Sequence, residues 1–217
     1  MKPLLRWFLA NVCLATLLFG SAGRLDLPMA WAYISLYGIF SLAAILRADP
    51  GLLEERIHPG PASRDRPFRH LVLLLVLSHF ALAGLDAGRF HWSDTVPTVL
   101  KVAGLFGLAA AFGLAGWASA VNPFFSSVIR IQRERGHHLI TAGPYQYIRH
   151  PGYAAAIVAA LCSGLALGSW LSMVPSFAGI MLLIRHTAVE DEFLRHELQG
   201  YSEYATRILY RLVPGLW

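Results

Sequence analysis

The sequence predicts an all-α integral membrane protein with about six transmembrane helices. Hydrophobic residues make up 56% of the 217 residues and charged residues only 14%, whereas charged residues are about a quarter of a soluble domain. The apolar residues come in blocks of membrane-spanning length, about 20 residues. Six such blocks in a chain of this length leave no soluble body in which they could be buried.

The first four predicted spans cover residues 4–23, 28–46, 71–87 and 97–118. The first resembles a secretory signal, because Lys2 and Arg6 precede it and small residues follow it. Its long apolar run favours a retained span instead. The last two spans, residues 152–168 and 171–187, form a tight pair. Gly and Ala are frequent in 152–168, which lets helices approach closely.

The distribution of basic residues predicts that both termini lie in the cytoplasm. With the N-terminus inside, six spans place all but three of the 18 Lys and Arg residues on the cytoplasmic side; the exceptions are Arg24, Arg89 and Lys101. Cytoplasmic loops of membrane proteins carry this excess of positive charge. The net charge of +5 is therefore assigned to topology and not to nucleic-acid binding. The longer polar segments fall on the same side, so we expect the active site there.

We expect two parts in the chain and no metal site. Residues 1–118 hold the first four spans, and residues 119–217 hold nearly all of the polar motifs. Cys13 and Cys162 each lie inside an apolar run, with no disulfide or ligand spacing. The histidines of the C-terminal part fit neither HExxH nor the spacing of a zinc cluster.

The stretch GPYQYIRHPGY, residues 143–153, interrupts this apolar chain just before the fifth span. Pro144 and Pro151 forbid a regular helix across it. Tyr145 brings an aromatic face, and Arg149 and His150 bring donors. Irregular polar backbone at membrane depth is tolerated only where it is packed in protein or lines a cavity. The stretch is therefore predicted to form one wall of a pocket; the alternative is an anchor at the level of the lipid headgroups.

The segment after the sixth span is expected to extend that helix into the cytoplasm. Glu190 and Asp191 then fall about one turn beyond the membrane, and His186 shares a face with Glu190 at i, i+4. Gly200 is the predicted C-cap of this helix. The stretch GYSEYATRILYRL is expected to restart as a short amphipathic helix.

Several of these motifs occur together from residue 122 to the C-terminus: GHHLITAGPYQYIRHPGY, EDEFL, GYSEY and YRLVPGLW. On them the chain is identified as a member of the isoprenylcysteine carboxyl methyltransferase family, which is membrane-embedded and uses S-adenosylmethionine. Phospholipid methyltransferases and bacterial thiol methyltransferases look like relatives of that family. The first three spans carry no part of the resemblance.

The resemblance implies a cytoplasmic S-adenosylmethionine site between the loop before the fifth span and the C-terminal helices. The positions that match the family's cofactor-binding motifs are Gln132, His137, His138, Leu139, Ile140, Tyr145, His150, Pro151, Gly152, Tyr153 and Glu190. Gln132 is the looser match. No GxGxxG follows a strand, so the cofactor site of soluble methyltransferases is not expected.

One departure from the family concerns the methyl acceptor. Carboxyl-methylating relatives have an arginine four residues before the glutamate, whereas this chain has His186 there and Arg185 one residue earlier. That shift turns the side chain by about 100° around a helix. The expected catalytic residues are Arg185, His186 and Arg149. We favour Arg185 holding a prenylcysteine-like or other lipid carboxylate; a thiol or phospholipid amine, deprotonated by His186 or His150, is the alternative.

A lipophilic or lipid-linked acceptor would enter from the bilayer, past the small residues Ala154, Ala155 and Ala156. Two other functions stay open. One is a membrane reductase of the sterol type, whose C-terminal half is similar but whose chains are longer. The other is a non-catalytic membrane component.

Overall fold

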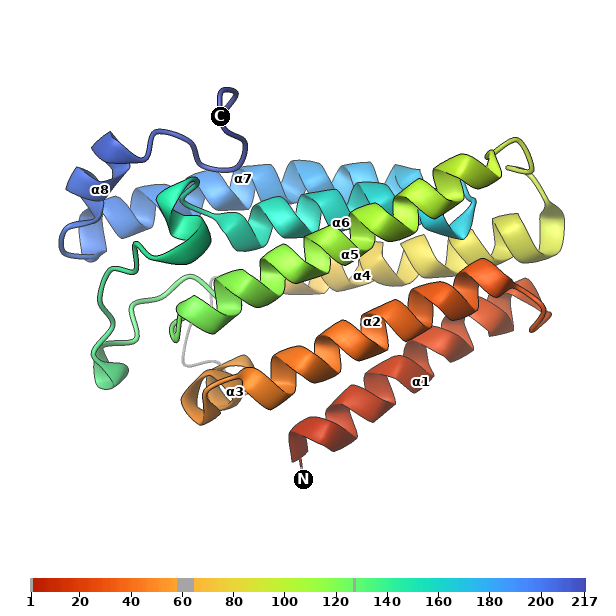
Figure 1. Cartoon of the computed structure of the whole chain (residues 1–217), viewed down its shortest axis with the longest axis horizontal. Coiled ribbons are helices and arrows are strands. Elements are labelled where there is room, and N and C mark those ends of the chain that lie inside the picture. Colours follow the sequence, from red (N-terminus) through yellow and green to blue (C-terminus); the bar gives the residue numbers. More distant parts are fainter. Residues whose placement is uncertain (1, 58–64, 127) are drawn as a thin grey trace.

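The computed structural model describes residues 2–57, 65–126 and 128–217, and within these ranges every regular element is helical (Figure 1). The six long helices are α1 (Lys2–Ala22), α2 (Pro28–Arg47), α4 (Arg66–Gly84), α5 (Thr98–Val121), α6 (Pro151–Leu167) and α7 (Met173–Glu197). The short elements are α3 (Pro50–Ile57), the π-helical turn η2 (Leu85–Phe90), the 3-10 turns η3 (Arg133–Arg135) and η4 (Gly143–Gln146), and α8 (Tyr201–Arg207). The predicted all-α fold is confirmed.

Each predicted span coincides with one long helix. Four segments are long and apolar enough to cross a membrane, namely Pro3–Ala22, Pro28–Arg47, Pro67–Phe90 and Thr98–Val121, as expected for an integral membrane protein. Helix α6 is apolar but only 17 residues long, and α7 ends in a charged stretch. That α6 and α7 also cross the bilayer therefore stays a prediction.

Proline marks several of the helix starts. Pro28 and Pro151 are the first residues of α2 and α6, and Pro97 is the N-cap of α5. A proline fits there because the first N–H groups of a helix have no partner within it. At the other end of α6, Gly168 has φ 72° and its N–H closes the helix on the carbonyls of Gly164 and Leu165.

The structure corrects two expectations at the C-terminus. Helix α7 ends at Glu197 and its C-cap is Leu198 in an extended conformation. Gly200, with φ 81°, is the N-cap of α8 and not the C-cap of α7. The restarted helix ends at Arg207, before the stretch GYSEYATRILYRL is complete. The C-cap Ile208 is extended, and the carbonyl groups from this residue onward accept hydrogen bonds from the candidate site, as described below.

Helix α5 packs most extensively against α6, across the predicted boundary between residues 118 and 119. Two glycines make this approach possible. A Cβ atom on Gly104 would lie 2.6 Å from the Ala166 backbone nitrogen, and one on Gly107 would lie 2.4 Å from the Cys162 sulfur. Small residues serve this purpose in membranes, where helix association depends on close packing. The two-part division of the chain itself stays a prediction.

A buried histidine links three of the helices. The Nδ1 atom of His79 in α4 lies 2.9 Å from the Ser172 carbonyl before α7, and its Nε2 lies 2.7 Å from Ser163 Oγ in α6. Because a carbonyl can only accept, Nδ1 carries the proton and Ser163 donates to Nε2. Hydrogen bonds of this kind join helices where lipid gives no hydrophobic driving force.

The polar segments gather at one end of the helix bundle. Helix α3, the loop of residues 122–150 and α8 lie at the left-hand end in Figure 1, whereas the opposite end carries the shorter turns around residues 23–27, 85–97 and 168–172. We call residues 122–150 the motif loop. The two ends match the two sides predicted from the basic residues, and the cytoplasmic orientation of the loop-bearing end stays a prediction.

Candidate active site

A cavity of about 510 Å³ opens at this end, among the motif loop, α4, α6, α7 and α8. Its volume lies in the range of small-molecule sites. Eleven of the fourteen residues predicted for the site line it: His137, His138, Leu139, Ile140, Tyr145, Arg149, His150, Pro151, Gly152, Tyr153 and Glu190. Gln132, Arg185 and His186 are not among the lining residues.

The motif loop reaches the cavity through η4. Gly143 has φ 59°, and the turn brings Tyr145 inward, where its hydroxyl accepts a hydrogen bond from Asn122 Nδ2 at 3.0 Å. The Tyr204 hydroxyl of α8 donates to the Tyr145 carbonyl at 2.7 Å. Burial raises the pKa of Tyr145 to about 12, so its ring is an uncharged wall of the cavity at neutral pH.

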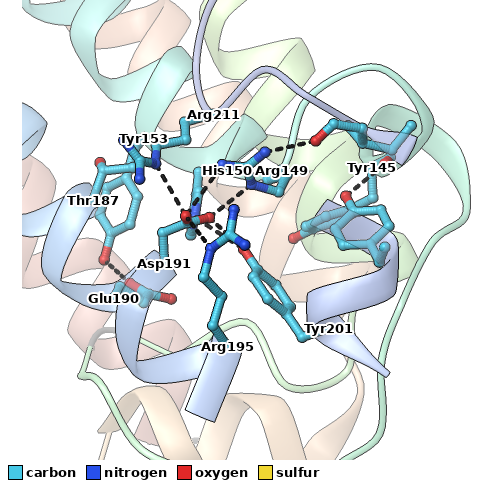
Figure 2. Close-up of polar contacts among 12 residues, drawn as sticks. Tyr145, Arg149, His150, Tyr153, Thr187, Glu190, Asp191, Arg195, Tyr201 and Arg211 are labelled. Carbon is cyan, nitrogen blue, oxygen red and sulfur yellow. Dashed lines mark hydrogen bonds and ion pairs between the residues drawn. The ribbon is translucent and has the colours of Figure 1, made fainter. Parts of the chain in front are cut away.

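Arg149 and Asp191 form a buried ion pair behind this wall (Figure 2). Arg149 Nε lies 2.7 Å from Asp191 Oδ1, and Nη2 lies 3.1 Å from Oδ2. The remaining Nη1 donates to the carbonyls of Ile208 and Leu209 at 2.6 and 2.9 Å. The Arg149 guanidinium is 3% exposed and uses its donors within the protein, which favours a supporting role over the predicted catalytic one.

Asp191 collects further donors from three elements. Its carboxylate accepts from the Tyr201 hydroxyl at 2.8 Å and from Arg211 Nε at 3.0 Å, and His150 Nε2 lies 3.2 Å away. Burial alone would raise the pKa of this carboxyl, but the hydrogen bonds from His150, Arg149, Tyr201 and Arg211 hold the pKa well below its usual range. Sequence reasoning chose Glu190 of the acidic pair and missed this role of Asp191.

The chain after α8 pairs with the motif loop through its backbone. The N–H groups of Arg149 and His150 donate to the carbonyls of Tyr210 and Arg211 at 3.0 and 2.9 Å. Together with the guanidinium of Arg149, these bonds use the carbonyl groups from residue 208 to 211. These contacts fix the C-terminal segment against the cavity wall.

Glu190 faces the cavity one residue before Asp191. Its Oε2 accepts a hydrogen bond of 2.5 Å from the Tyr153 hydroxyl of α6, and Figure 2 shows the two side chains meeting between α6 and α7. Among the described residues that line the cavity, Glu190 carries the single carboxylate. It is therefore the group best placed to accept hydrogen bonds from a cationic ligand.

His137 stands on the opposite wall and is uncharged at neutral pH. Its ring stacks on Phe124 with centroids 4.4 Å apart, and its Nδ1 accepts from the Gln132 backbone N–H at 3.2 Å. Burial, reinforced by the nearby His138 and by arginines, lowers the pKa of His137 to about 4. Gln132 itself is fully buried and donates to the Phe124 carbonyl at 2.9 Å, so it supports the wall without lining it.

The structure separates Arg185, which the sequence analysis favoured, from the neighbouring His186. Arg185 is exposed on α7 and does not line the cavity. His186 is buried, stacked on Phe68 of α4 with centroids 3.7 Å apart, and meets the edge of Tyr153. Its Nε2 has no hydrogen-bond partner in the described part of the chain. Neither residue lines the cavity, but His186 contacts Tyr153, which does.

Helix α4 contributes a wall that sequence reasoning missed. The residues involved are Phe68, Arg69, Val72, Leu73 and Val76. Those from Arg69 onward recur at i, i+3, i+4 and i+7, so they form one face of the helix. Leu183 of α7 and Ala156 of α6 continue the apolar lining, whereas Ala154 and Ala155 are buried. The spacing on α4 is visible in the sequence, but no motif marks it as part of a site.

Residues 103–196, a little under half of the chain, match the profile of a known family. That family is isoprenylcysteine carboxyl methyltransferase. The resemblance inferred from the motifs is thereby confirmed, and the matched region, which runs from α5 into α7, contains all fourteen predicted site residues. Helices α3, α4 and α8 lie outside it.

Relatives named as isoprenylcysteine methyltransferases match a part of the chain of similar length. A probable protein-S-isoprenylcysteine O-methyltransferase of Oryza sativa subsp. japonica is 34% identical over 86 residues, which is 39% of this chain and 45% of that protein. Protein-S-isoprenylcysteine O-methyltransferase B of Arabidopsis thaliana is 30% identical over 87 residues, 39% of this chain and 44% of that protein. The chain thus matches less than half the length of these plant relatives.

Two further comparisons cover more of the chain at lower identity. The cobalt-zinc-cadmium resistance protein CzcN of Cupriavidus metallidurans is 28% identical over 158 residues, 69% of this chain and 68% of that protein. The solved structure of a eukaryotic intramembrane Ras methyltransferase, ICMT, covers 91% of this chain and 71% of its own, with 16% identity and a TM-score of 0.49.

Proposed function

We propose that the cavity binds S-adenosylmethionine and that the protein transfers its methyl group to a lipophilic acceptor, a prenylcysteine-like or other lipid carboxylate. This proposal rests on one observation: residues of the family's motifs and an apolar face of α4 line the same cavity. Leu139, Tyr145 and Glu190 line it from the family region, and Leu73 and Val76 line it from α4.

The residues present fit this cofactor. Glu190 can accept hydrogen bonds from an ammonium group or from ribose hydroxyls, because Tyr153 occupies only one of its acceptor positions. Leu139, Tyr145 and Tyr204 offer aliphatic and aromatic faces on which an adenine can pack. His150 lines the same cavity, and because its Nε2 faces Asp191, it could donate to a ligand carboxylate through Nδ1 as an imidazolium.

The protein's part in the reaction is to position the reactants and exclude water. When bound, S-adenosylmethionine supplies an electrophilic methyl group on a sulfonium. The buried pair of Arg149 and Asp191 fixes the wall against which it would lie, and alignment of an attacking group with a methyl lowers the barrier without any further chemistry. An acceptor that is already ionised, such as a carboxylate, needs no base.

One observation favours a second kind of acceptor. The Nε2 atom of His186 has no hydrogen-bond partner among the described residues and lies beside Tyr153, which lines the cavity. A neutral imidazole can take a proton near neutral pH. His186 could therefore serve a thiol or a phospholipid amine, both of which must lose a proton on methylation.

The test is methyl transfer from tritiated S-adenosylmethionine by the full-length protein in lipid nanodiscs. The acceptors are N-acetyl-S-farnesylcysteine, palmitate, dodecanethiol and phosphatidylethanolamine, with phosphatidylcholine nanodiscs as the background. We expect a methyl ester, recognised by base-labile tritiated methanol. Labelled thioether or methylated amine would assign the second kind of acceptor. Protein that is folded but labels none of the four would refute the proposed function.

A further inference from the structure

Four arginines line the cavity, and two of them form ion pairs within the protein. Arg149 is paired with Asp191, as described above. Arg130 of the motif loop lies 2.7 Å from Glu55 of α3, through its Nη2 and the Oε2 of the glutamate, and it also contacts Glu134. The donors of these two arginines are used within the walls of the cavity.

The other two, Arg56 of α3 and Arg69 of α4, form no ion pair among the described residues. The residues outside the described ranges contain no Asp or Glu, so they hold no carboxylate for either arginine. The Arg56 guanidinium lies over the Phe125 ring, 5.1 Å from its centroid. Against these two cations the cavity lining offers one carboxylate, that of Glu190, which meets Tyr153.

Arg69 lies at the N-terminal end of an apolar stripe on α4. Val72, Leu73 and Val76 follow it on the same helix face and line the same cavity. Arg69 lies two residues before the predicted start of the span at residue 71. Its charge therefore stands at the rim of the predicted bilayer, and the stripe runs down into it. This arrangement suits a ligand with an anionic head and an apolar tail.

We propose that Arg69 is the specificity-determining residue that holds the acceptor's carboxylate, with Arg56 as a second cation above the Phe125 ring. Arg69 thereby takes the place of the arginine that carboxyl-methylating relatives carry on the helix of α7, where this chain has His186. The proposal rests on the proposed methyltransferase function. A guanidinium suits this task because it stays charged and matches both oxygens of a carboxylate.

The chemistry of a carboxylate acceptor balances without a base. The carboxylate oxygen forms a bond to the methyl carbon, the bond from that carbon to sulfur breaks, and its electron pair stays on sulfur. The products are a methyl ester and S-adenosylhomocysteine, and no proton is released. A thiol acceptor would release one proton per turnover. His186 is therefore dispensable for an acid acceptor, and required for a thiol acceptor if it serves as the base.

The experiment compares KM for N-acetyl-S-farnesylcysteine and for dodecanethiol in nanodiscs, using wild type, Arg69→Gln, Arg69→Lys and Arg207→Gln. Loss of a charged hydrogen-bond partner corresponds to about 10- to 100-fold in affinity, so Arg69→Gln should raise KM for the acid by that factor. It should leave KM for the thiol and the affinity for S-adenosylhomocysteine unchanged. Arg69→Lys should recover part of the loss, and Arg207→Gln, which removes an exposed charge on α8, should change nothing.

Three results would overturn the inference. One is an unchanged KM for the acid in Arg69→Gln. Another is the same loss in Arg185→Gln with Arg69→Gln unaffected, which would return the carboxylate to α7. The third is a wild type that methylates the thiol but not the acid, which would leave the methyltransferase function standing. Failure to methylate any acceptor would remove the proposed function as well, so the two failures are distinguishable.

Discussion

At the scale of single residues, the candidate site depends on a buried carboxylate that does not line the cavity. Asp191 is fully buried and accepts from Arg149, Tyr201 and Arg211. The sequence places these partners 42, 10 and 20 residues away, so no local pattern announces the cluster. Glu190 could be predicted because a family motif contains it. The role of Asp191 as a shared hydrogen-bond acceptor depends on the packing of α7, α8 and the motif loop, which the sequence does not show.

Replacing Asp191 by Asn tests this cluster. The variant keeps the shape of the side chain but leaves the Arg149 guanidinium buried without its counter-charge, which costs about 3–5 kcal/mol in comparable buried pairs. We expect the free energy of unfolding in detergent to fall by that amount. Glu192→Gln, an exposed neighbour, is the matched control and should stay within about 0.5 kcal/mol of wild type. Equal stability of the two variants would contradict the buried pair.

Through His137, the folding stability of the protein should depend on pH. Its pKa in the folded protein is about 4, below the value of about 6.5 for an unfolded chain. Between these values the unfolded chain binds a proton that the folded protein does not, so stability falls as pH drops from 6.5 to 4 and then levels off. His137→Gln should flatten this part of a plot of melting temperature against pH. A nuclear magnetic resonance titration of His137 with a midpoint near 6.5 would show that the site is not as buried as described.

At the scale of elements, the start of α6 depends on a glycine. A Cβ atom on Gly152 would lie 2.5 Å from both Cε2 and Cζ of Phe125. The Arg56 guanidinium lies over the ring of the same Phe125. The RHPGY motif therefore needs glycine at this position for close packing, in addition to any contact with a ligand. The first turn of α6 and the motif loop can adopt their relative positions only because the side chain is missing.

Gly152→Ala should push the Phe125 ring out of place. Overpacking of this kind costs about 1–3 kcal/mol, so we expect a lower melting temperature and weaker binding of S-adenosylhomocysteine. Phe125→Leu in the same background should restore part of the loss, because the smaller side chain vacates the space. Gly179→Ala in α7 is the control, since a Cβ atom there would meet nothing within 4 Å. Wild-type behaviour of Gly152→Ala would contradict the close packing.

The elements were predictable to the extent that their own residues determine them. Long apolar runs predicted all six long helices, and α7 extends past its apolar part as expected. The pairing of residues 208–211 with Arg149 and His150 was not predictable, because these contacts join segments about 60 residues apart in the chain. The contribution of α4 was missed for a similar reason. Val72, Leu73 and Val76 look like any lipid-facing residues until α6 and α7 are placed beside them.

At the scale of the whole molecule, the cavity borders both the polar segments and the predicted membrane spans. The motif loop and α8 border it on the side of the polar segments, and the α4 stripe with Ala156 and Leu183 borders it along the predicted spans. A water-soluble cofactor and a lipophilic acceptor can then arrive by separate routes. Of the three alanines predicted to border a lateral opening, only Ala156 lines the cavity, so the lateral route remains a prediction that one position can test.

Ala156→Trp should obstruct the lateral route. The indole would fill space between α4 and α6, so turnover of N-acetyl-S-farnesylcysteine should fall at least about 10-fold, the effect of losing about 1.4 kcal/mol of binding. Binding of S-adenosylhomocysteine should be unchanged. Val158→Trp, at an exposed position of α6 outside the cavity, is the control for a bulky residue on the same helix. Normal turnover in Ala156→Trp would place the acceptor's entry elsewhere.

The central claim is that this cavity binds S-adenosylmethionine through Glu190, and calorimetric titration of S-adenosylhomocysteine into the purified protein tests it most directly. Wild type should bind with one site per chain. Glu190→Ala should weaken binding by about 1.5–3 kcal/mol, the scale of a hydrogen bond to a charged group, while Glu203→Ala, on the exposed face of α8, should bind like wild type. Equal affinity of wild type and Glu190→Ala, or no heat of binding in a folded wild type, would contradict the account.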